Sequence, residues 1–205
     1  TSKPPVSVVI CSKNESENLH KFLPSILEQD YPNFEVVVVN DGSTDTTSEV
    51  LSIFKEKYDN LYETYIPQSA EIISRKKLGL TLGVKAAKNE ILLFTDADCK
   101  AVSRHWISKM VRNFTPETEF VLGCGLYMYE KTFINRLISY DTLTIALQYL
   151  GFAFAGKPYM GVGRNLAYRK STFMSHKGFA GLLHVQSGDD DLFVNRRACK
   201  LSYYL

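Results

Sequence analysis

Four consecutive valines, at positions 36–39, limit the fold of this chain more than any other segment. Valine is β-branched and favours extended backbone. The side chains of a strand alternate between the two faces of a sheet, so a strand that is apolar throughout needs cover on both faces. Sheets that helices cover on both faces belong to the α/β class, in which most strands run parallel.

The same rhythm, a short apolar run followed by a helical pattern, extends from residue 6 to residue 114. In the first helical segment, apolar residues recur at helical spacing, as at Leu19, Phe22, Leu23 and Ile26. Repeated alternation of strand and helix predicts a parallel, doubly wound sheet. Strands are expected at residues 6–11, 35–39, 61–66, 91–95 and 120–129, and helices at 17–29, 46–58, 73–88 and 104–114.

The rhythm ends near residue 130, and the rest of the chain is expected to form the more variable half of a single domain, residues 1–205. Its most apolar segment, residues 143–156, is interrupted by Thr144 and Gln148. Apolar runs of about 10–14 residues are core or interfacial helices, and a membrane span needs about 18 or more. A buried core helix is the preferred interpretation, and a membrane-surface or acceptor-side helix is the alternative.

Composition narrows the class of protein. The 205 residues carry a net charge of only +2, which argues against a nucleic-acid partner, because such proteins usually carry a basic stripe. The four cysteines are far apart and form no C-x-x-C pair, so we expect reduced thiols and an intracellular protein. The apolar run at residues 6–11 is too short for a secretory leader, and none is expected.

The first of two acidic clusters contains Asp96 and Asp98, directly after the apolar residues 91–94. Ligands of α/β sheets bind outside the carboxyl ends of the strands. Carboxylates at such a place can share Mg²⁺ or Mn²⁺, which prefer oxygen ligands. Alternation along an extended segment would put both side chains on one side of the chain. The alternative is a pair of solvated turn aspartates.

Asp189, Asp190 and Asp191 form the second acidic cluster. The structural interpretation is a helix N-terminus, which acidic residues favour. Three in a row exceed what capping needs, and a buried one near other carboxylates would have a raised pKa and act as a base near neutral pH. The basic partners available are Arg75, Lys76, Lys77 and Arg164. A solvated helix face is the alternative for the two lysines.

Asp41 follows the valine strand in a tight turn. Asp45 is the more natural cap for the helix after this turn, as Asn14 or Ser16 is for the first helix. Asp41 is then left at the strand end, where its carboxylate can accept a base N–H or a ribose hydroxyl, or serve only the turn. A dinucleotide fold is disfavoured, because no G-x-G-x-x-G follows the first strand.

Five short segments in a fixed order resemble the motifs of the family 2 glycosyltransferases, which have the GT-A fold. The resemblance covers the chain from residue 6 to about residue 196 and implies a nucleotide-sugar-binding half, residues 1–100, and an acceptor-side half, residues 101–205. The segments are residues 6–15 (VSVVICSKNE), 39–45 (VNDGSTD), 94–98 (FTDAD), 161–167 (GVGRNLA) and 188–192 (GDDDL).

The resemblance also implies roles for single residues. Asp41 would bind the nucleotide base, Asp96 the ribose and the metal on the diphosphate, and Asp98 the metal. Asp189, with Asp190 as the runner-up, would deprotonate the acceptor hydroxyl. The other donor contacts expected are Cys11, Asn14, Lys76 and Arg164.

The implied reaction is an inverting displacement at the anomeric carbon of a nucleotide sugar, with no covalent enzyme intermediate. Mg²⁺ or Mn²⁺ would neutralise the departing diphosphate. By the same resemblance UDP is the preferred nucleotide, ahead of GDP, and the acceptor is a saccharide or a lipid-linked molecule.

Two departures from the family pattern stand out. Asn40 stands where many relatives have Asp, which is tolerable if Asp41 does the binding. The Q-x-x-R-W-type motif that often follows the acidic cluster is missing, so the C-terminal end is expected to be incomplete. Together with the apolar segment 143–156, this predicts a cytoplasmic protein with peripheral contact at the cytoplasmic face of a membrane.

Two other functions remain open. A haloacid dehalogenase-like phosphatase also has D-x-D at a strand end, but its motif needs an early strand and a Thr or Val where this chain has Lys100. A non-catalytic nucleotide-sugar-binding or scaffold protein would share the binding residues. Only an assay of sugar transfer separates that protein from an enzyme.

Overall fold

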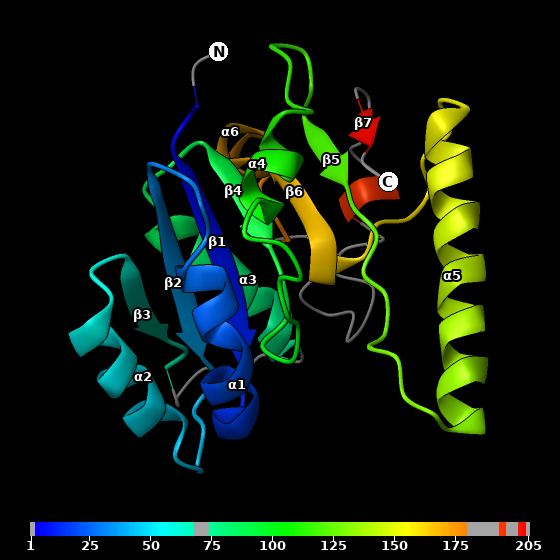
Figure 1. Ribbon diagram of the computed structural model, residues 1–205. Helices are drawn as coiled ribbons and strands as arrows, with labels where there is room; N and C mark the ends of the chain where they lie inside the picture. The colour runs from blue at the N-terminus through cyan, green and yellow to red at the C-terminus, as the bar shows by residue number, and fades with distance from the viewer. Residues whose placement is uncertain (1–2, 68–73, 180–192, 196–200, 204–205) are drawn as a thin grey trace.

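The computed structural model describes residues 3–67, 74–179, 193–195 and 201–203, and in this part of the chain seven strands form one sheet with helices on both faces (Figure 1). The strands are β1 (Val6–Ser12), β2 (Phe34–Asn40), β3 (Leu61–Tyr65), β4 (Ile91–Phe94), β5 (Phe120–Leu122), β6 (Leu166–Arg169) and β7 (Leu201–Tyr203). The helices are α1 (Ser16–Leu27), α2 (Thr47–Lys57), α3 (Arg75–Ala86), α4 (Trp106–Val111), α5 (Phe133–Phe154), the 3₁₀ helix η1 (Gly163–Asn165) and α6 (Lys170–Ser175).

The strand order is β3-β2-β1-β4-β6-β5-β7. β1 to β4 run parallel, β6 runs antiparallel to both of its neighbours, and β7 runs parallel to β5. The predicted α/β class, with a mostly parallel sheet flanked by helices, is confirmed. From β1 the chain builds outward to β2 and β3, then returns to place β4 on the other side of β1. Ligands of such sheets bind at this reversal of strand order, beyond the carboxyl ends of the strands.

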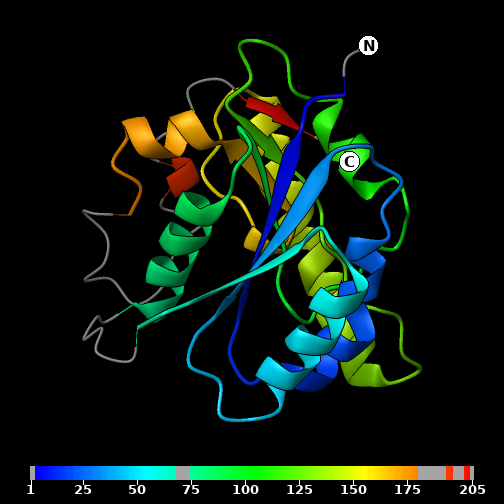
Figure 2. The ribbon, with the colours of Figure 1, turned by 90° about the vertical axis from the view of Figure 1, so that its left-hand side faces the viewer.

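The valine strand lies inside the parallel part of the sheet, and none of its four valines is more than 1% exposed. Along β1, Val8 and Ile10 face a core shared with α1, α2 and α4, whereas Val9 faces a core shared with α3, α5 and α6. Figure 2 shows α1 and α2 on one side of the sheet and α3 and α6 on the other. The predicted burial on both faces is confirmed.

Two glycines bring α3 close to the sheet. A Cβ atom at Gly83 would come 2.5 Å from Cγ1 of Val9, and one at Gly79 would come 3.1 Å from Sγ of Cys11. A larger residue at Gly83 would have to push the helix or the strand aside, because packed interiors leave little room. This close packing fixes the first turn of α3, which begins at Arg75.

The first helix is capped by a residue from a different loop. α1 begins at Ser16, whose N–H donates to Oδ2 of Asp45 at 3.1 Å, so the predicted cap by Asn14 or Ser16 is wrong. At α2 the N-cap position is held by Thr46 and not by the predicted Asp45, but Oδ1 of Asp45 still accepts from the Thr47 N–H at 3.1 Å. The Thr47 hydroxyl, together with these N–H groups, lowers the pKa of Asp45 to about 2. One carboxylate therefore ties the starts of two helices together.

The strand predicted at residues 120–129 is much shorter, since β5 ends at Leu122. Beyond it, side chains satisfy the backbone carbonyls. The Tyr149 hydroxyl donates to the Gly123 carbonyl at 2.9 Å, and the Asn165 amide donates to the Cys124 carbonyl at 2.9 Å. The carbonyls of Gly123 and Cys124 therefore keep hydrogen-bond partners although the strand has ended.

Two further elements differ from expectation. α4 is shorter than the helix predicted at residues 104–114, and β6 was not predicted. The four residues of β6 are too few to show an alternating pattern. They become a strand because β4 and β5 pair with them from both sides, so tertiary pairing decides their conformation.

α5 is longer and more exposed than expected. It begins ten residues before the predicted segment 143–156, where the Thr132 side chain accepts from the Asn135 N–H at 3.1 Å. The prediction of a buried core helix is confirmed for only one face of α5, where side chains at helical spacing are buried. The buried stripe is Thr142, Ala146, Tyr149, Leu150 and Ala153. In the described part of the chain, every helix is too short or too polar to cross a membrane.

Candidate functional site

The strand register brings four loops to one edge of the sheet. Ser12 pairs with Asn40, and Val9 pairs with Phe94. Phe94 also pairs with Leu166, and η1 packs against β4, so η1 lies beside the loop that follows β4. The ends of β1, β2 and β4 and the start of β6 therefore meet at the carboxyl edge, at the reversal of strand order.

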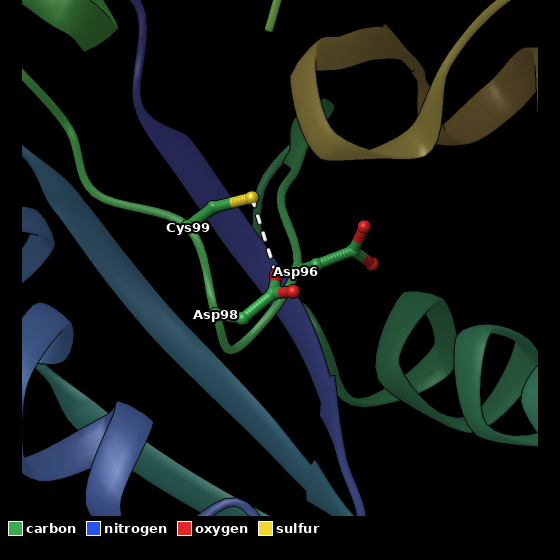
Figure 3. A group of neighbouring side chains, drawn as sticks. All are labelled: Asp96, Asp98 and Cys99. Carbon is green, nitrogen blue, oxygen red and sulfur yellow. Dashed lines mark hydrogen bonds between the residues drawn. The ribbon is translucent and has the colours of Figure 1, made fainter. Parts of the chain in front are cut away.

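Asp96 and Asp98 lie on the loop after β4, with Cys99 next to them (Figure 3). One carboxylate oxygen of each aspartate and the Cys99 sulfur all lie within 4.8 Å of one another. The side chains come together as predicted, but the predicted cause, extended alternation, is wrong. The chain turns instead, because the Cys99 N–H donates to the Asp96 carbonyl at 3.1 Å.

The donor set of this cluster fits a divalent cation. Mg²⁺ and Mn²⁺ prefer oxygen ligands, and Asp96 and Asp98 both present carboxylates that solvent reaches. Burial and the two neighbouring carboxylates raise the pKa of the Cys99 thiol to about 11, and the thiol donates to Oδ1 of Asp98 at 3.4 Å. Near neutral pH this cluster therefore offers oxygen ligands, with the sulfur protonated.

Asp41 is held between two cations at the end of β2. The Nε atom of Arg75 donates to its Oδ1 at 2.5 Å, and Nζ of Lys13 lies 3.8 Å from its Oδ2. The Asp41 N–H donates to the Ser12 carbonyl at 2.8 Å. Sequence reasoning named Arg75 only as an available basic partner and did not name Lys13 as part of the site. The signal for Lys13 was its place in the motif at residues 6–15.

Two asparagines shape the loop that carries Asp41. Asn14 has a φ of 56°, a left-handed conformation that asparagine tolerates, and its Oδ1 accepts from the Thr44 N–H at 2.7 Å. Buried Asn40 accepts from the Ser43 N–H at 3.0 Å, so the residue that departs from the family pattern builds the turn. The predicted contact of Asn14 with the donor stays a prediction.

Three consecutive cations open α3. Nζ of Lys76 lies 3.5 Å from Oδ1 of Asp96, with 48% and 41% of the two side chains exposed. Lys77 is fully buried, so a solvated face is the wrong interpretation for this residue. Arg75 and Lys76 therefore contact carboxylates on the loops of two different strands.

Arg164 lies in η1, beside the loop of Asp96 and Asp98. Its guanidinium carbon is 5.8 Å from the ring centroid of Tyr127, a cation–π distance. Its Nε is buried and has no hydrogen-bond partner among the described residues. The predicted role of Arg164 in donor binding is not tested by these contacts and stays a prediction.

The remaining predicted residues fall into two groups. Cys11 is partly buried, and its sulfur lies against Gly79 of α3. Its contact with the nucleotide stays a prediction. The predicted bases, Asp189 and Asp190, lie outside the described residues, as does Asp191.

Surface hollows alone do not locate the site. One hollow of about 590 Å³ lies beside Asp30, Arg104 and His105, and another of about 340 Å³ lies beside Glu17 and His20. Each is lined by a single carboxylate. Paired carboxylates at the carboxyl edge of the sheet are the stronger indication of chemistry, because they can share a cation.

Several curated proteins are similar in sequence to this chain, including the following two. Poly-beta-1,6-N-acetyl-D-glucosamine synthase of Staphylococcus epidermidis is 33% identical over 93 residues, which are 45% of this chain and 21% of that protein. Glycosyltransferase AglE of Haloferax volcanii is 37% identical over 112 residues, which are 53% of this chain and 34% of that protein. The matches therefore span about a fifth and a third of these two relatives.

Solved structures show the same arrangement of strands and helices. The mannosyltransferase PcManGT from Pyrobaculum calidifontis, in complex with GDP-Man and Mn²⁺, matches with a TM-score of 0.68 and 25% identity over 93% of this chain and 50% of that chain. TarS of S. aureus, in complex with UDP-GlcNAc, matches with a TM-score of 0.67 and 19% identity over 98% of this chain and 56% of that chain. At 19% identity, the likeness to TarS concerns the fold alone.

The family itself is shown by a match over most of the chain. Residues 7–179 match the family described as Glycosyl transferase family 2. This range includes Asp41, Asp96 and Asp98, and the family match removes the phosphatase alternative. The sheet and its helices form a GT-A-type fold, as the structural relatives indicate. The chain therefore belongs to glycosyl transferase family 2.

Proposed function

We propose that residues 1–205 form the catalytic domain of a glycosyltransferase that moves a sugar, with inversion, from a UDP-sugar to an acceptor hydroxyl. Residues 1–100 bind the donor, and residues 101–205 build the acceptor side. The observation that carries the proposal is the meeting of Asp96 and Asp98 at the end of β4, beside the strand end that carries Asp41. Family membership supports the reaction class.

The donor is held by carboxylates and cations of the carboxyl edge. Asp41 accepts an N–H of the base, Asp96 contacts the ribose and the metal, and Asp98 contacts the metal. Mg²⁺ or Mn²⁺, when bound, neutralises charge on the departing diphosphate. Four further donor contacts are proposed from the loops around this edge, at Cys11, Asn14, Lys76 and Arg164. The complexes of PcManGT with GDP-Man and Mn²⁺ and of TarS with UDP-GlcNAc support a nucleotide-sugar donor.

The chemical step needs one base. Asp189, or Asp190 as the second candidate, takes the proton from the acceptor hydroxyl as its oxygen attacks the anomeric carbon. The bond between that carbon and the diphosphate oxygen breaks, and the nucleoside diphosphate leaves. Attack from the face opposite the leaving group inverts the configuration, so no covalent enzyme intermediate is required.

Binding and transfer can be tested separately. In the full-length protein, Asp98→Asn should weaken Mn²⁺-dependent UDP binding by about tenfold or more, since a hydrogen-bonding or coordinating charge is worth about 1.5–3 kcal/mol. Asp189→Asn should keep that binding and lose sugar transfer. The readouts are calorimetric titration of UDP with Mn²⁺ and release of UDP from sugar nucleotides. Full-length protein that binds UDP but transfers and hydrolyses no sugar nucleotide would establish the non-catalytic alternative instead.

We also propose a saccharide or lipid-linked acceptor and peripheral contact with the cytoplasmic face of a membrane. Many large apolar side chains of α5 and the loop before it are exposed, and contiguous apolar surface marks an interaction site. The most exposed of them are Leu126, Tyr129, Phe133, Ile134, Leu137, Tyr140, Leu147 and Phe154.

Liposome flotation of the full-length protein tests the membrane contact. The double variant Phe133→Ser and Leu137→Ser should float less than the unmodified protein. Ile53→Ser is the matched control, because Ile53 is 64% exposed but lies on α2. Equal flotation of the double variant and the control would contradict the proposal, as would an unmodified protein that stays in the soluble fraction.

A further inference from the structure

The two oxygens of the Asp41 carboxylate have different surroundings. Oδ1 accepts the Arg75 Nε–H at 2.5 Å, while among the described residues Oδ2 has only the Lys13 ammonium, at 3.8 Å. The first is a charge-assisted hydrogen bond, and the second is beyond hydrogen-bond range. Arg75 is 28% exposed and Lys13 is 56% exposed, so solvent screens the Lys13 contact more.

Both members of the Arg75–Asp41 pair are held by other contacts. Arg75 opens α3, which packs on β1 and β2 through Gly83. Asp41 is held by its N–H bond to the Ser12 carbonyl, at the end of two paired strands. A pair between two fixed elements loses little side-chain freedom on forming, unlike a loose surface ion pair.

The pairing of Arg75 with Asp41 affects which nucleobase, uracil or guanine, the site accepts. Uracil presents one N–H, at N3, between two carbonyl oxygens. Guanine presents two adjacent N–H groups, at N1 and N2, beside one carbonyl. A carboxylate with two open oxygens suits the two adjacent N–H groups of guanine. A carboxylate with one oxygen covered by a guanidinium suits a single N–H, and the positive charge beside it favours a carbonyl neighbour over a second N–H.

The fold itself does not decide the nucleotide. One structural relative was solved with GDP-Man and another with UDP-GlcNAc. Selection must therefore come from side chains at the base. We propose that Arg75 is the residue that makes this site select uracil over guanine, by covering Oδ1 of Asp41. The proposal rests on the proposed contact of Asp41 with the base.

Titration of nucleoside diphosphates into the full-length protein with Mn²⁺ tests the proposal. The variant is Arg75→Gln, which keeps most of the side-chain length and removes the charge. The matched control is Lys13→Gln, which removes the other cation beside Asp41. We expect the unmodified protein to bind UDP about tenfold or more tighter than GDP, the range of a hydrogen bond to a charged group. Arg75→Gln should reduce this ratio by about tenfold, while Lys13→Gln should leave the ratio unchanged.

UDP and GDP also differ in the size of the base, and a comparison of inosine diphosphate with GDP avoids this difference because both bases are purines. Hypoxanthine has the N1–H and the carbonyl of guanine but lacks its amino group. The unmodified protein should therefore bind inosine diphosphate tighter than GDP, and Arg75→Gln should lose this preference. A UDP to GDP ratio that Arg75→Gln leaves unchanged, or an unmodified protein that prefers GDP, overturns the proposal.

Two further variants keep the outcomes distinct. Asp41→Ala tests the base contact itself: UDP binding that survives it contradicts the proposed function of Asp41. If Asp41→Ala abolishes UDP binding but Arg75→Gln keeps the ratio, only the role of Arg75 is wrong. If Arg75→Gln does not fold, as judged by its melting transition, Arg75→Lys replaces it in the same titrations. It keeps the charge without the planar fork and should give an intermediate ratio.

Discussion

α3 and α5 pack into the same core on one face of the sheet, but they meet it in different ways. α3 approaches β1 closely through Gly83, and two cations of its first turn, Arg75 and Lys76, contact carboxylates at the strand ends. α5 contacts the core through a single stripe and leaves most of its other apolar side chains in solvent. The geometry of the proposed donor side is therefore set by internal packing, whereas α5 leaves a large apolar surface exposed.

The largest expected effect compares two leucines on α5. Leu150 is 5% exposed and Leu147 is 61% exposed. Leu150→Ala should lower the free energy of unfolding by about 2–5 kcal/mol, since it leaves a cavity in the core. Leu147→Ala should change it by about 0.5 kcal/mol or less. Urea unfolding of both variants measures the difference. Equal losses would mean that Leu147 is covered in solution and that the contrast with α3 is smaller than described.

The next comparison places alanine at one glycine of each helix. At Gly83 a Cβ would meet Val9 and Val39 at 2.5 and 3.0 Å, and we expect a loss of about 1–3 kcal/mol in stability from overpacking. At Gly151 the new Cβ would meet no described atom within 4 Å apart from its chain neighbours and the nearby backbone of α5 itself. Gly151→Ala should be neutral or should stabilise α5 by up to about 1 kcal/mol, because alanine favours helix. Thermal and urea unfolding check both, and a neutral Gly83→Ala would show that α3 is not held closely.

A smaller effect concerns Lys76, in the first turn of α3. Lys76 and Asp96 form an exposed pair, which is worth about 0.2–1 kcal/mol. Lys76→Gln removes a cation that competes with the metal, so Mn²⁺ alone should bind up to about fivefold tighter. The same variant should bind UDP more weakly, because a charge near the diphosphate is lost. Titrations of Mn²⁺ and of UDP measure the two changes, and shifts in the same direction would contradict the proposed position of Lys76.

The smallest expected effect is a pH dependence on the donor side. The pKa of Asp45 falls from its ordinary 3.8 to about 2 in the folded protein. Its contribution to stability is therefore present above about pH 4 and is lost as the pH falls through about 2. The difference in melting temperature between the unmodified protein and Asp45→Ala should shrink across this window. A difference that stays constant between these two pH values would mean that Asp45 caps neither helix.

Sequence reasoning succeeded where a pattern is local. The valine run, the helical spacing in α1 and the aspartates after β4 all carry their signal within a few residues, so the parallel half and the place of the candidate site could be predicted. It failed where contacts with segments distant in the sequence decide the local structure. The cap of α1 comes from Asp45, and β6 exists because β4 and β5 pair with it.

The same limit applies to side chains of the site. Lys76 and Lys77 look alike in sequence, but one is half exposed and the other is fully buried. Asp96 and Asp98 come together through a turn, which a strand pattern does not reveal. The pairing of Arg75 with Asp41 joins residues 34 positions apart, and the sequence gives no local signal for it.

Because Arg75 and Lys76 are neighbours on one helical turn, the proposed base contact and the proposed metal site depend on the position of the same helix. A small displacement of α3 along the sheet would lengthen the contacts to Asp41 and Asp96 together. Substitutions deep under this helix, at positions that neither nucleotide nor metal would reach, should therefore lower the proposed preference for UDP and strengthen Mn²⁺ binding at the same time. The geometry of the proposed donor site would thus depend on how tightly α3 packs in the interior of the protein.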